Sequence, residues 1–339
     1  MENAGAARKL ASLAAWGGGT ATALAGTAGA LLYAEATLAR KTIGILTEDK
    51  PPDATGWYGR GRPGPALRVA LLGDSSAAGY GVFRVEDTPG AFLASGLAER
   101  ANRRVHLREF AVVGAQTSEL AAQIDRALAT QPDVTVILIG ANDVTHAVPP
   151  AVSVRHLREG VRRLRDAGIE VVVGTCPDLG TLGPVPPPLK QVARIWSRKM
   201  AGAQTVVVIE EGGRTVSLGP ILGPEFAAAP ALLFGPDQFH PSADGYRSVA
   251  GVLLPSVLAA LKLVPTAELA PQPNRGEGVL PIGAAAVQAV RTPGTELDGT
   301  EVAGSRRGVR GLWVEMRHRR RAPQAEAQAP DADEVVAGG

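Results

Sequence analysis

Residues 67–76 read Leu-Arg-Val-Ala-Leu-Leu-Gly-Asp-Ser-Ser, and this stretch decides the fold. Five of the first six residues are apolar, so an extended strand here has no polar face. Strands buried on both faces are typical of parallel sheets that helices cover on each side. Ligands of such sheets bind beyond the carboxyl ends of the strands. We therefore expect a strand at 67–72, ended by Gly73, and a binding site at the residues that follow.

The same alternation of apolar strand patterns and amphipathic helix patterns fills residues 66–263. It predicts an α/β domain with a central, mostly parallel sheet of about five strands, covered by helices on both faces. The other expected strands lie at 105–113, 133–139, 169–173 and 205–209. The expected helices lie at 89–100, 118–129, 152–167 and 244–263.

The N-terminal residues 1–41 contain a charge-free run at 10–34 that follows Arg8-Lys9. As a helix this run would extend about 37 Å, enough to cross a hydrocarbon core of about 30 Å. Three interpretations compete: an uncleaved membrane anchor, a cleaved secretory signal ending near Ala34-Glu35-Ala36, and a soluble packing helix. We expect a membrane-anchored or secreted protein with an extracytoplasmic catalytic domain, although basic residues on both sides leave the orientation open.

Two further segments lack the alternating pattern. Residues 42–65, which include Pro51-Pro52, are expected to form a linker. Residues 264–339 are rich in Pro, Ala and Arg and are expected to be a disordered tail. Within the tail, residues 306–321 hold seven arginines and one histidine, which indicates a solvated basic segment or a patch for anionic lipid head groups.

The composition of the 339-residue chain excludes several function classes. The net charge is only +2, from 35 basic and 33 acidic residues, and no nucleic-acid-binding motif is present, so we expect no nucleic-acid partner. A single cysteine, Cys176, excludes an intramolecular disulfide and a cysteine-rich metal site. Cys176 follows an apolar run, so we expect a buried residue at a strand end. We expect neither a cofactor nor a metal.

Three side chains have the chemistry of serine-dependent acyl transfer. Ser75 directly follows the first strand, where it is either a nucleophile or a simple helix cap. Asp237 and His240 stand three positions apart before the last helix. A single turn then places the carboxylate on the imidazole Nδ1–H and leaves Nε2 for the serine. These spacings favour a nucleophile, a general base and an orienting acid.

Two other residues follow predicted strands and supply hydrogen-bond donors. Gly114 comes after the second strand, where the absence of a side chain lets a backbone N–H approach a substrate. Asn142, in Gly140-Ala141-Asn142-Asp143, comes after the third strand and either caps the next helix or donates its amide to an oxyanion. With Ser75, these residues complete the groups that acyl chemistry needs.

At these residues the sequence resembles the SGNH (GDSL-type) hydrolases, a superfamily of esterases and lipase-like acylhydrolases. The family's four blocks match Ser75, Gly114, Asn142 and His240, and the resemblance covers about residues 66–263. It implies a three-layer α/β/α sandwich of flavodoxin-like type and a Ser75–His240–Asp237 triad. It also implies an oxyanion hole made of the Ser75 N–H, the Gly114 N–H and the Asn142 side chain.

Two positions depart from the family pattern. Ser76 stands where the family usually has leucine, and no polar residue immediately precedes Gly114, which follows Ala111-Val112-Val113. Because the side chain at 76 does no chemistry, we expect the first departure to be tolerated. The second departure concerns the block that carries Gly114.

Two segments near the predicted site bear on the substrate. The apolar loop 223–234 and the proline-rich segment 184–188 favour an apolar acyl group over a bare sugar. The leading hypothesis is a membrane-associated acyl-ester hydrolase that acts on a small or lipid-like ester. The alternatives are an acyltransferase or deacetylase of cell-envelope glycans, and a non-catalytic membrane-tethered binding protein.

Overall fold

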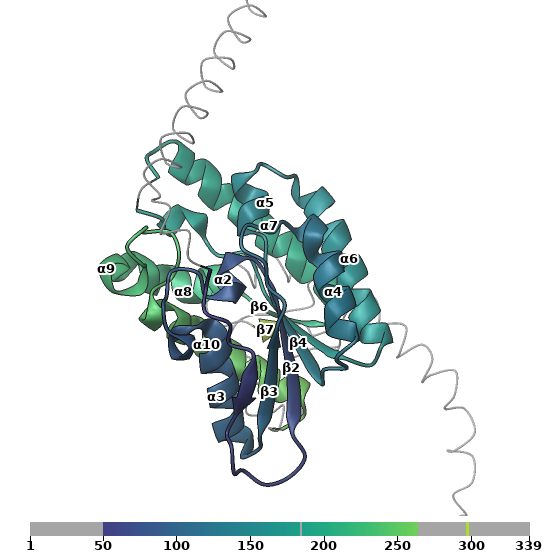
Figure 1. Cartoon of the computed structure of the whole chain (residues 1–339). Coiled ribbons are helices and arrows are strands. Elements are labelled where there is room, and N and C mark those ends of the chain that lie inside the picture. The colour runs from purple at the N-terminus through teal and green to yellow at the C-terminus, as the bar shows by residue number, and fades with distance from the viewer. Residues whose placement is uncertain (1–49, 184, 264–295, 298–339) are drawn as a thin grey trace, which may run out of the picture.

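The computed structural model describes residues 50–183, 185–263 and 296–297 (Figure 1). A seven-stranded sheet runs through it in the order β1-β3-β2-β4-β5-β6-β7. The five inner strands are parallel, and β1 and β7 add antiparallel edges. The strands are β1 (Gly56–Tyr58), β2 (Leu67–Gly73), β3 (Val105–Glu109), β4 (Val134–Leu138), β5 (Glu170–Gly174), β6 (Arg214–Val216) and β7 (Glu296–Leu297).

Helices connect these strands. The α-helices are α2 (Ser75–Ala78), α3 (Pro89–Ala101), α4 (Leu120–Leu128), α5 (Ala141–Thr145), α6 (Pro150–Asp166), α7 (Leu189–Glu210), α8 (Leu218–Ala228), α9 (Pro230–Leu233) and α10 (Ala243–Ala260). Three 3₁₀ turns accompany them: η1 (Val85–Asp87), η2 (Thr117–Glu119) and η3 (Leu179–Thr181). Figure 1 shows α3 and α10 on one side of the sheet and α4 and α6 on the other.

Both faces of the sheet are buried, as the apolar strand patterns predict. Val69 and Leu71 of β2 point into a core shared with α3 and α10. Their neighbours Ala70 and Leu72 point into a second core, shared with α4 and α6. The successive residues of a strand face opposite sides, so each covering layer of helices has its own apolar contact. The expected α/β/α sandwich around a parallel sheet is confirmed.

The fifth parallel strand lies later than expected. The apolar residues 205–209 continue α7 and do not form a strand, and Val207 and Val208 pack into the core from that helix. A short apolar run fits a buried helix end as well as a strand, and α7 is 22 residues long. The strand itself is β6, which begins after Gly212-Gly213.

Three other expected boundaries also differ. Strand β3 ends at Glu109, and Val112 and Val113 are exposed in the loop beyond it. The segment expected as a linker contains β1, which pairs with β3, while the expected loop at 223–234 forms the end of α8 and the whole of α9. A three-residue edge strand and short helices carry too little periodicity to be recognised from sequence.

The expected anchor, residues 10–34, lies outside the described residues, as does the Arg-rich segment 306–321. Among the residues that are described, no helix combines the length and apolar character needed to cross a membrane.

Glu109, the last residue of β3, holds the chain just before β1. Its carboxylate accepts the Ala54 N–H at 3.0 Å, and Ala54 itself is fully buried. Burial, followed by the nearby Asp53 charge, raises the pKa of Glu109 to about 7 against the lowering effect of the Ala54 N–H. The edge of the sheet therefore contains a carboxyl group that ionises near neutral pH.

We predict that Glu109→Gln removes a pH dependence of folding stability. The unfolded chain releases the Glu109 proton near pH 4.5 and the folded protein near pH 7, so this group's contribution to stability falls as the pH rises between those values. The variant, which keeps an oxygen acceptor for Ala54, should gain up to about 3 kcal/mol relative to wild type at pH 8, and the difference should shrink toward pH 4. Urea unfolding across this range measures it; parallel pH profiles for the two proteins would contradict it.

Candidate active site

The carboxyl end of β2 is fixed by a close approach to β4. Gly73 has φ +140°, and a Cβ at this position would lie 1.8 Å from the carbonyl oxygen of Leu138. The buried side-chain amide of Gln123 bonds both backbone groups of Gly73, at 2.8 Å to its N–H and 2.9 Å to its C=O. The next residue, Asp74, caps α2 by accepting the Ser76 N–H at 2.9 Å. Ser75 is therefore not the helix cap, and its hydroxyl is left for another partner.

The structure brings Ser75, His240 and Asp237 into one hydrogen-bonded chain. His240 Nε2 lies 3.0 Å from Ser75 Oγ, and His240 Nδ1 lies 2.6 Å from Asp237 Oδ2. The other carboxylate oxygen of Asp237 accepts the N–H groups of Phe239 and His240, each at 3.0 Å. Because Asp237 holds Nδ1–H, the ring presents an unprotonated Nε2 to the serine.

The carboxyl groups of Asp237 and Asp74 have pKa values that are shifted in opposite directions. Burial is the largest influence on Asp237 and acts to raise its pKa, but hydrogen bonds from the His240 ring and from two N–H groups together hold the pKa of Asp237 below its usual range. Burial raises the pKa of Asp74 to about 6 against the lowering effects of the Ser76 N–H, the nearby His240 and the Ser76 side chain. Asp237 is thus ionised throughout the neutral range.

The aromatic residues Tyr80 and Phe239 hold the His240 ring in place. Their rings meet it edge-on, with centroids 4.7 and 4.9 Å away. Tyr246, fully buried on α10, donates its hydroxyl to the Tyr80 carbonyl at 2.6 Å. This bond ties the segment after the nucleophile to the helix that follows the His240 loop.

Gly114 and Asn142 lie on neighbouring segments beyond β3 and β4. Asn142 is inside α5, where Gly140 is the cap residue, so its side chain does not cap the helix. Its amide donates to the Ala115 carbonyl at 3.1 Å, which joins α5 to the residue after Gly114. Gly114 itself is exposed and has φ +82°, with open space where a Cβ would stand. The Val112 N–H bonds the Gly73 carbonyl at 3.0 Å and holds this loop against the end of β2.

Several supporting residues were not identified from the sequence. Asp143 is buried and accepts both the N–H and the hydroxyl of Thr117, at 3.0 and 2.9 Å, and so fixes the end of the Gly114 loop. Gln204, also buried, bonds the Ile139 carbonyl and the Cys176 N–H, at 2.8 and 2.7 Å, and joins the ends of β4 and β5. Gln123 is the one with a readable signal, because it falls on the apolar side of α4 between Leu120 and Ile124.

Cys176 is buried, as expected from its position after an apolar run. Burial, reinforced by the charges of Asp74, Asp143 and Asp178, raises the pKa of its thiol well above the usual value. Such a thiol stays protonated and unreactive at neutral pH. Within the described part of the chain, no three His, Cys, Asp or Glu side chains are grouped so that they could hold a metal ion.

Comparisons with known proteins identify the class to which this fold and site belong. The sequence profile of the GDSL-like lipase/acylhydrolase family matches residues 71–248. The chain is 41% identical over 260 residues to the GDSL-like esterase Rv1075c of Mycobacterium tuberculosis. The aligned region covers 71% of this chain and 82% of that protein.

Solved structures give weaker similarities. TesA is 20% identical with a TM-score of 0.44, covering 58% of this chain and 100% of its own. A lipase/acylhydrolase from Enterococcus faecalis is 19% identical with a TM-score of 0.41, covering 57% of this chain and 96% of its own.

The family match and the 41% identical relative establish that the chain belongs to the GDSL-like lipase/acylhydrolase (SGNH hydrolase) family. It is a GDSL-type esterase, a carboxylic ester hydrolase.

We predict that Gln123→Met destabilises the fold through the backbone of Gly73. The Gly73 carbonyl keeps the Val112 N–H as a partner, but the buried Gly73 N–H loses its acceptor. One unsatisfied buried donor costs about 1–3 kcal/mol. Urea unfolding should show this loss, whereas the same substitution at the exposed Gln191 should change stability by less than about 0.5 kcal/mol. Equal stabilities for the two variants would contradict the role assigned to Gln123.

Proposed function

We propose that Ser75 is the nucleophile of this esterase, His240 its general base and Asp237 the group that orients and stabilises the imidazole. The observation that carries the proposal is the unbroken chain from Ser75 Oγ through the His240 ring to Asp237, with contacts of 3.0 and 2.6 Å. Both contacts are within the hydrogen-bond reach that proton transfer requires.

The reaction follows from these positions. Ser75 Oγ attacks the ester carbonyl carbon while His240 Nε2 takes the hydroxyl proton. The tetrahedral intermediate then expels the alcohol, which receives that proton from His240, and an acyl-enzyme remains on Ser75. Water attacks the acyl carbon with His240 again as base, and the carboxylic acid leaves. Asp237 stays ionised and stabilises the imidazolium in both steps, which fits its lowered pKa.

We assign the oxyanion to three donors. Ser75 is the first residue of α2, so its N–H belongs to the groups that a helix leaves without an intrahelical acceptor. The Asn142 amide carries two hydrogens, of which one binds Ala115 and one remains for the substrate. The Gly114 N–H is the third donor, in a loop that the Val112–Gly73 bond and the Asn142–Ala115 bond hold beside Ser75.

The triad is tested by single substitutions. Ser75→Ala and His240→Ala should each lower kcat for p-nitrophenyl butyrate by about 10⁴-fold or more, and Asp237→Asn by a similar factor. Ser95→Ala, on the exposed side of α3, is the control and should retain wild-type turnover. Wild-type kcat in a folded Ser75→Ala protein would refute the assignment.

The oxyanion donor is tested by Asn142→Ala. Loss of one such donor lowers kcat by about 10²–10³-fold, with little change in KM, because the interaction forms in the transition state. Thr145→Ala on the exposed end of α5 provides the control for an effect on the helix alone. If Asn142→Ala raised KM and left kcat unchanged, Asn142 would be a substrate-binding group and not an oxyanion donor.

Two finer expectations remain proposals. Transfer of the acyl group to an acceptor other than water, as in an acyltransferase, would appear as an ester product when a candidate alcohol is supplied with the substrate. Membrane association through residues 10–34 would appear as full-length protein in the membrane fraction, released by detergent and not by salt. Wholly soluble full-length protein would eliminate the anchor.

A further inference from the structure

An apolar cavity of about 90 Å³ lies beside the segment that carries the nucleophile, although neither Ser75 nor His240 is among its lining residues. Asp74 and Ser76, on either side of Ser75, both line it, and so does Phe239, whose ring packs against His240. The cavity extends from α2 toward α8 and the loop after β5. Its apolar lining includes Leu138, Leu179, Leu182, Leu218, Leu222 and Phe226.

We propose that this cavity holds the acyl group of the substrate and that Ser76 sets the width of its mouth. The preferred substrates are then esters of unbranched saturated acids of about four to six carbons, from the size of the cavity. This inference rests on the proposed role of Ser75, because the acyl group stays bonded to Ser75 Oγ between the two half-reactions.

The polar side chains of the lining are occupied by protein partners. The Tyr246 hydroxyl donates to Tyr80, the Thr181 hydroxyl to the Asp178 carbonyl at 2.8 Å, and the Thr175 hydroxyl to the Val216 carbonyl at 3.4 Å. Asp74 accepts the Ser76 N–H. A sugar placed here would lose the water around its hydroxyls without gaining equivalent bonds, which is costly. An alkyl chain forms no hydrogen bonds with water and therefore loses none when it enters the cavity.

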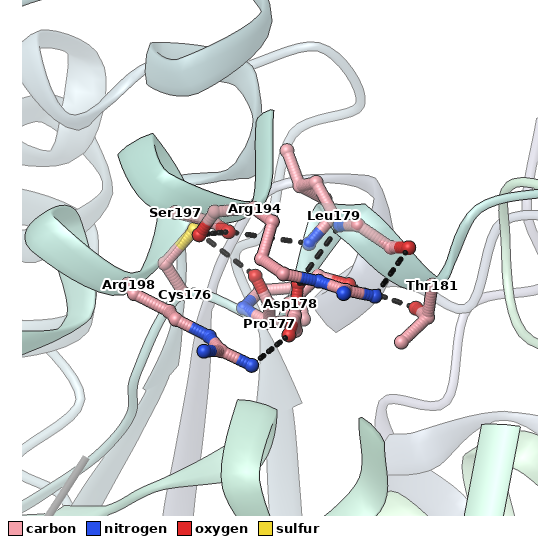
Figure 2. A network of polar contacts seen from close by, with 9 residues as sticks. Cys176, Pro177, Asp178, Leu179, Thr181, Arg194, Ser197 and Arg198 are labelled. Carbon is pink, nitrogen blue, oxygen red and sulfur yellow. Dashed lines mark hydrogen bonds and ion pairs between the residues drawn. The ribbon is translucent and has the colours of Figure 1, made fainter. Parts of the chain in front are cut away.

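Asp178 is the other charged group of the lining, and its charge is already compensated (Figure 2). Arg198 on α7 bonds one carboxylate oxygen at 3.0 Å, and Arg194 lies 3.6 Å from the other, which also accepts the Gly180 N–H at 2.9 Å. Only 8% of the Asp178 side chain is exposed. Asp178 therefore holds the loop after β5 against α7 and does not offer a free charge to a ligand.

Ser76 is the residue at which this chain departs from the Gly-Asp-Ser-Leu motif that gives the family its name. The side chain at 76 does no chemistry, but it is half-buried and lines the cavity next to Ser75. A leucine there would occupy space that the serine leaves open. The departure therefore has a consequence for the width of the cavity, although none for the triad.

The size of the cavity limits the length of the chain. By the same measure of volume, a site that holds one water has about 15 Å³, so this cavity takes roughly six water-sized groups. Each methylene that enters should raise kcat/KM by about fourfold, until the space is filled. The optimum should therefore lie beyond acetate and short of octanoate.

The test is a series of p-nitrophenyl esters, from acetate through butyrate, hexanoate and octanoate to dodecanoate, measured as kcat/KM on the full-length protein. Wild type should peak at butyrate or hexanoate. Ser76→Leu should lower the ratio of kcat/KM for hexanoate to that for acetate by about tenfold, because the leucine would fill the space of one or two methylenes. Ser95→Leu, the same change on the exposed face of α3, should keep the wild-type ratio.

A second variant, expected to shift the chain-length optimum in the opposite direction, tests the proposal if Ser76→Leu is inactive. Leu222→Ala should enlarge the cavity and move the optimum toward octanoate. Leu164→Ala, in the core on the other face of the sheet, removes the same atoms and should leave the profile unchanged. Circular dichroism of each variant establishes that it is folded.

The outcomes separate this inference from the proposed function. If Ser75→Ala retains turnover, the nucleophile is wrong and the acyl assignment falls with it. If Ser75→Ala abolishes turnover while Ser76→Leu and Leu222→Ala both keep the wild-type chain-length profile, the nucleophile stands and the acyl group lies elsewhere.

Discussion

The hydrogen bond between Ser75 Oγ and His240 Nε2 is the contact on which the candidate site depends, and it joins residues 165 positions apart. Each partner is held independently. On the serine side, the end of β2 approaches β4 so closely that only glycine fits at 73, and Gln123 bonds its backbone. Because β3 and β4 flank β2 on opposite sides, the chain reverses its direction across the sheet at β2, which is where open α/β sheets bind ligands.

The electrostatics of the site follow from the number of donors around each buried carboxylate. Asp237 accepts hydrogen bonds from the imidazole and two backbone N–H groups, so its pKa stays low in spite of burial. Asp74 has fewer donors, the Ser76 N–H and the Ser76 side chain, and burial raises its pKa to about 6. The first remains a fixed negative charge beside the imidazole, while the second becomes protonated as the pH falls toward 6 and below. The two aspartates differ because their hydrogen-bond donors differ, and the His240 ring is the donor that lowers the pKa of Asp237 most.

The sheet and the candidate triad were predictable because both depend on local signals. Strands such as 67–72 are apolar on both faces, and an Asp three residues before a His needs only one turn to meet it. The strand at 214–216 was not predicted, because three residues are too few to show an alternating pattern. The apolar run at 205–209 fits a helix as well as a strand. Asp143 and Gln204 act on backbone groups 26 and 65 positions away, and such contacts leave no trace in local sequence, whereas Gln123 is marked only by its place on the apolar side of α4.

The chemistry on Ser75 is the central claim, and labelling by a fluorophosphonate tests it most directly. The reagent should add one phosphonyl group per chain, located by mass spectrometry of peptides on Ser75. Labelling should be slowed by an excess of ester substrate present during the reaction and be absent in His240→Ala, in which the hydroxyl has lost its base. An adduct on a different serine, or an unlabelled protein that still hydrolyses esters, would contradict the account.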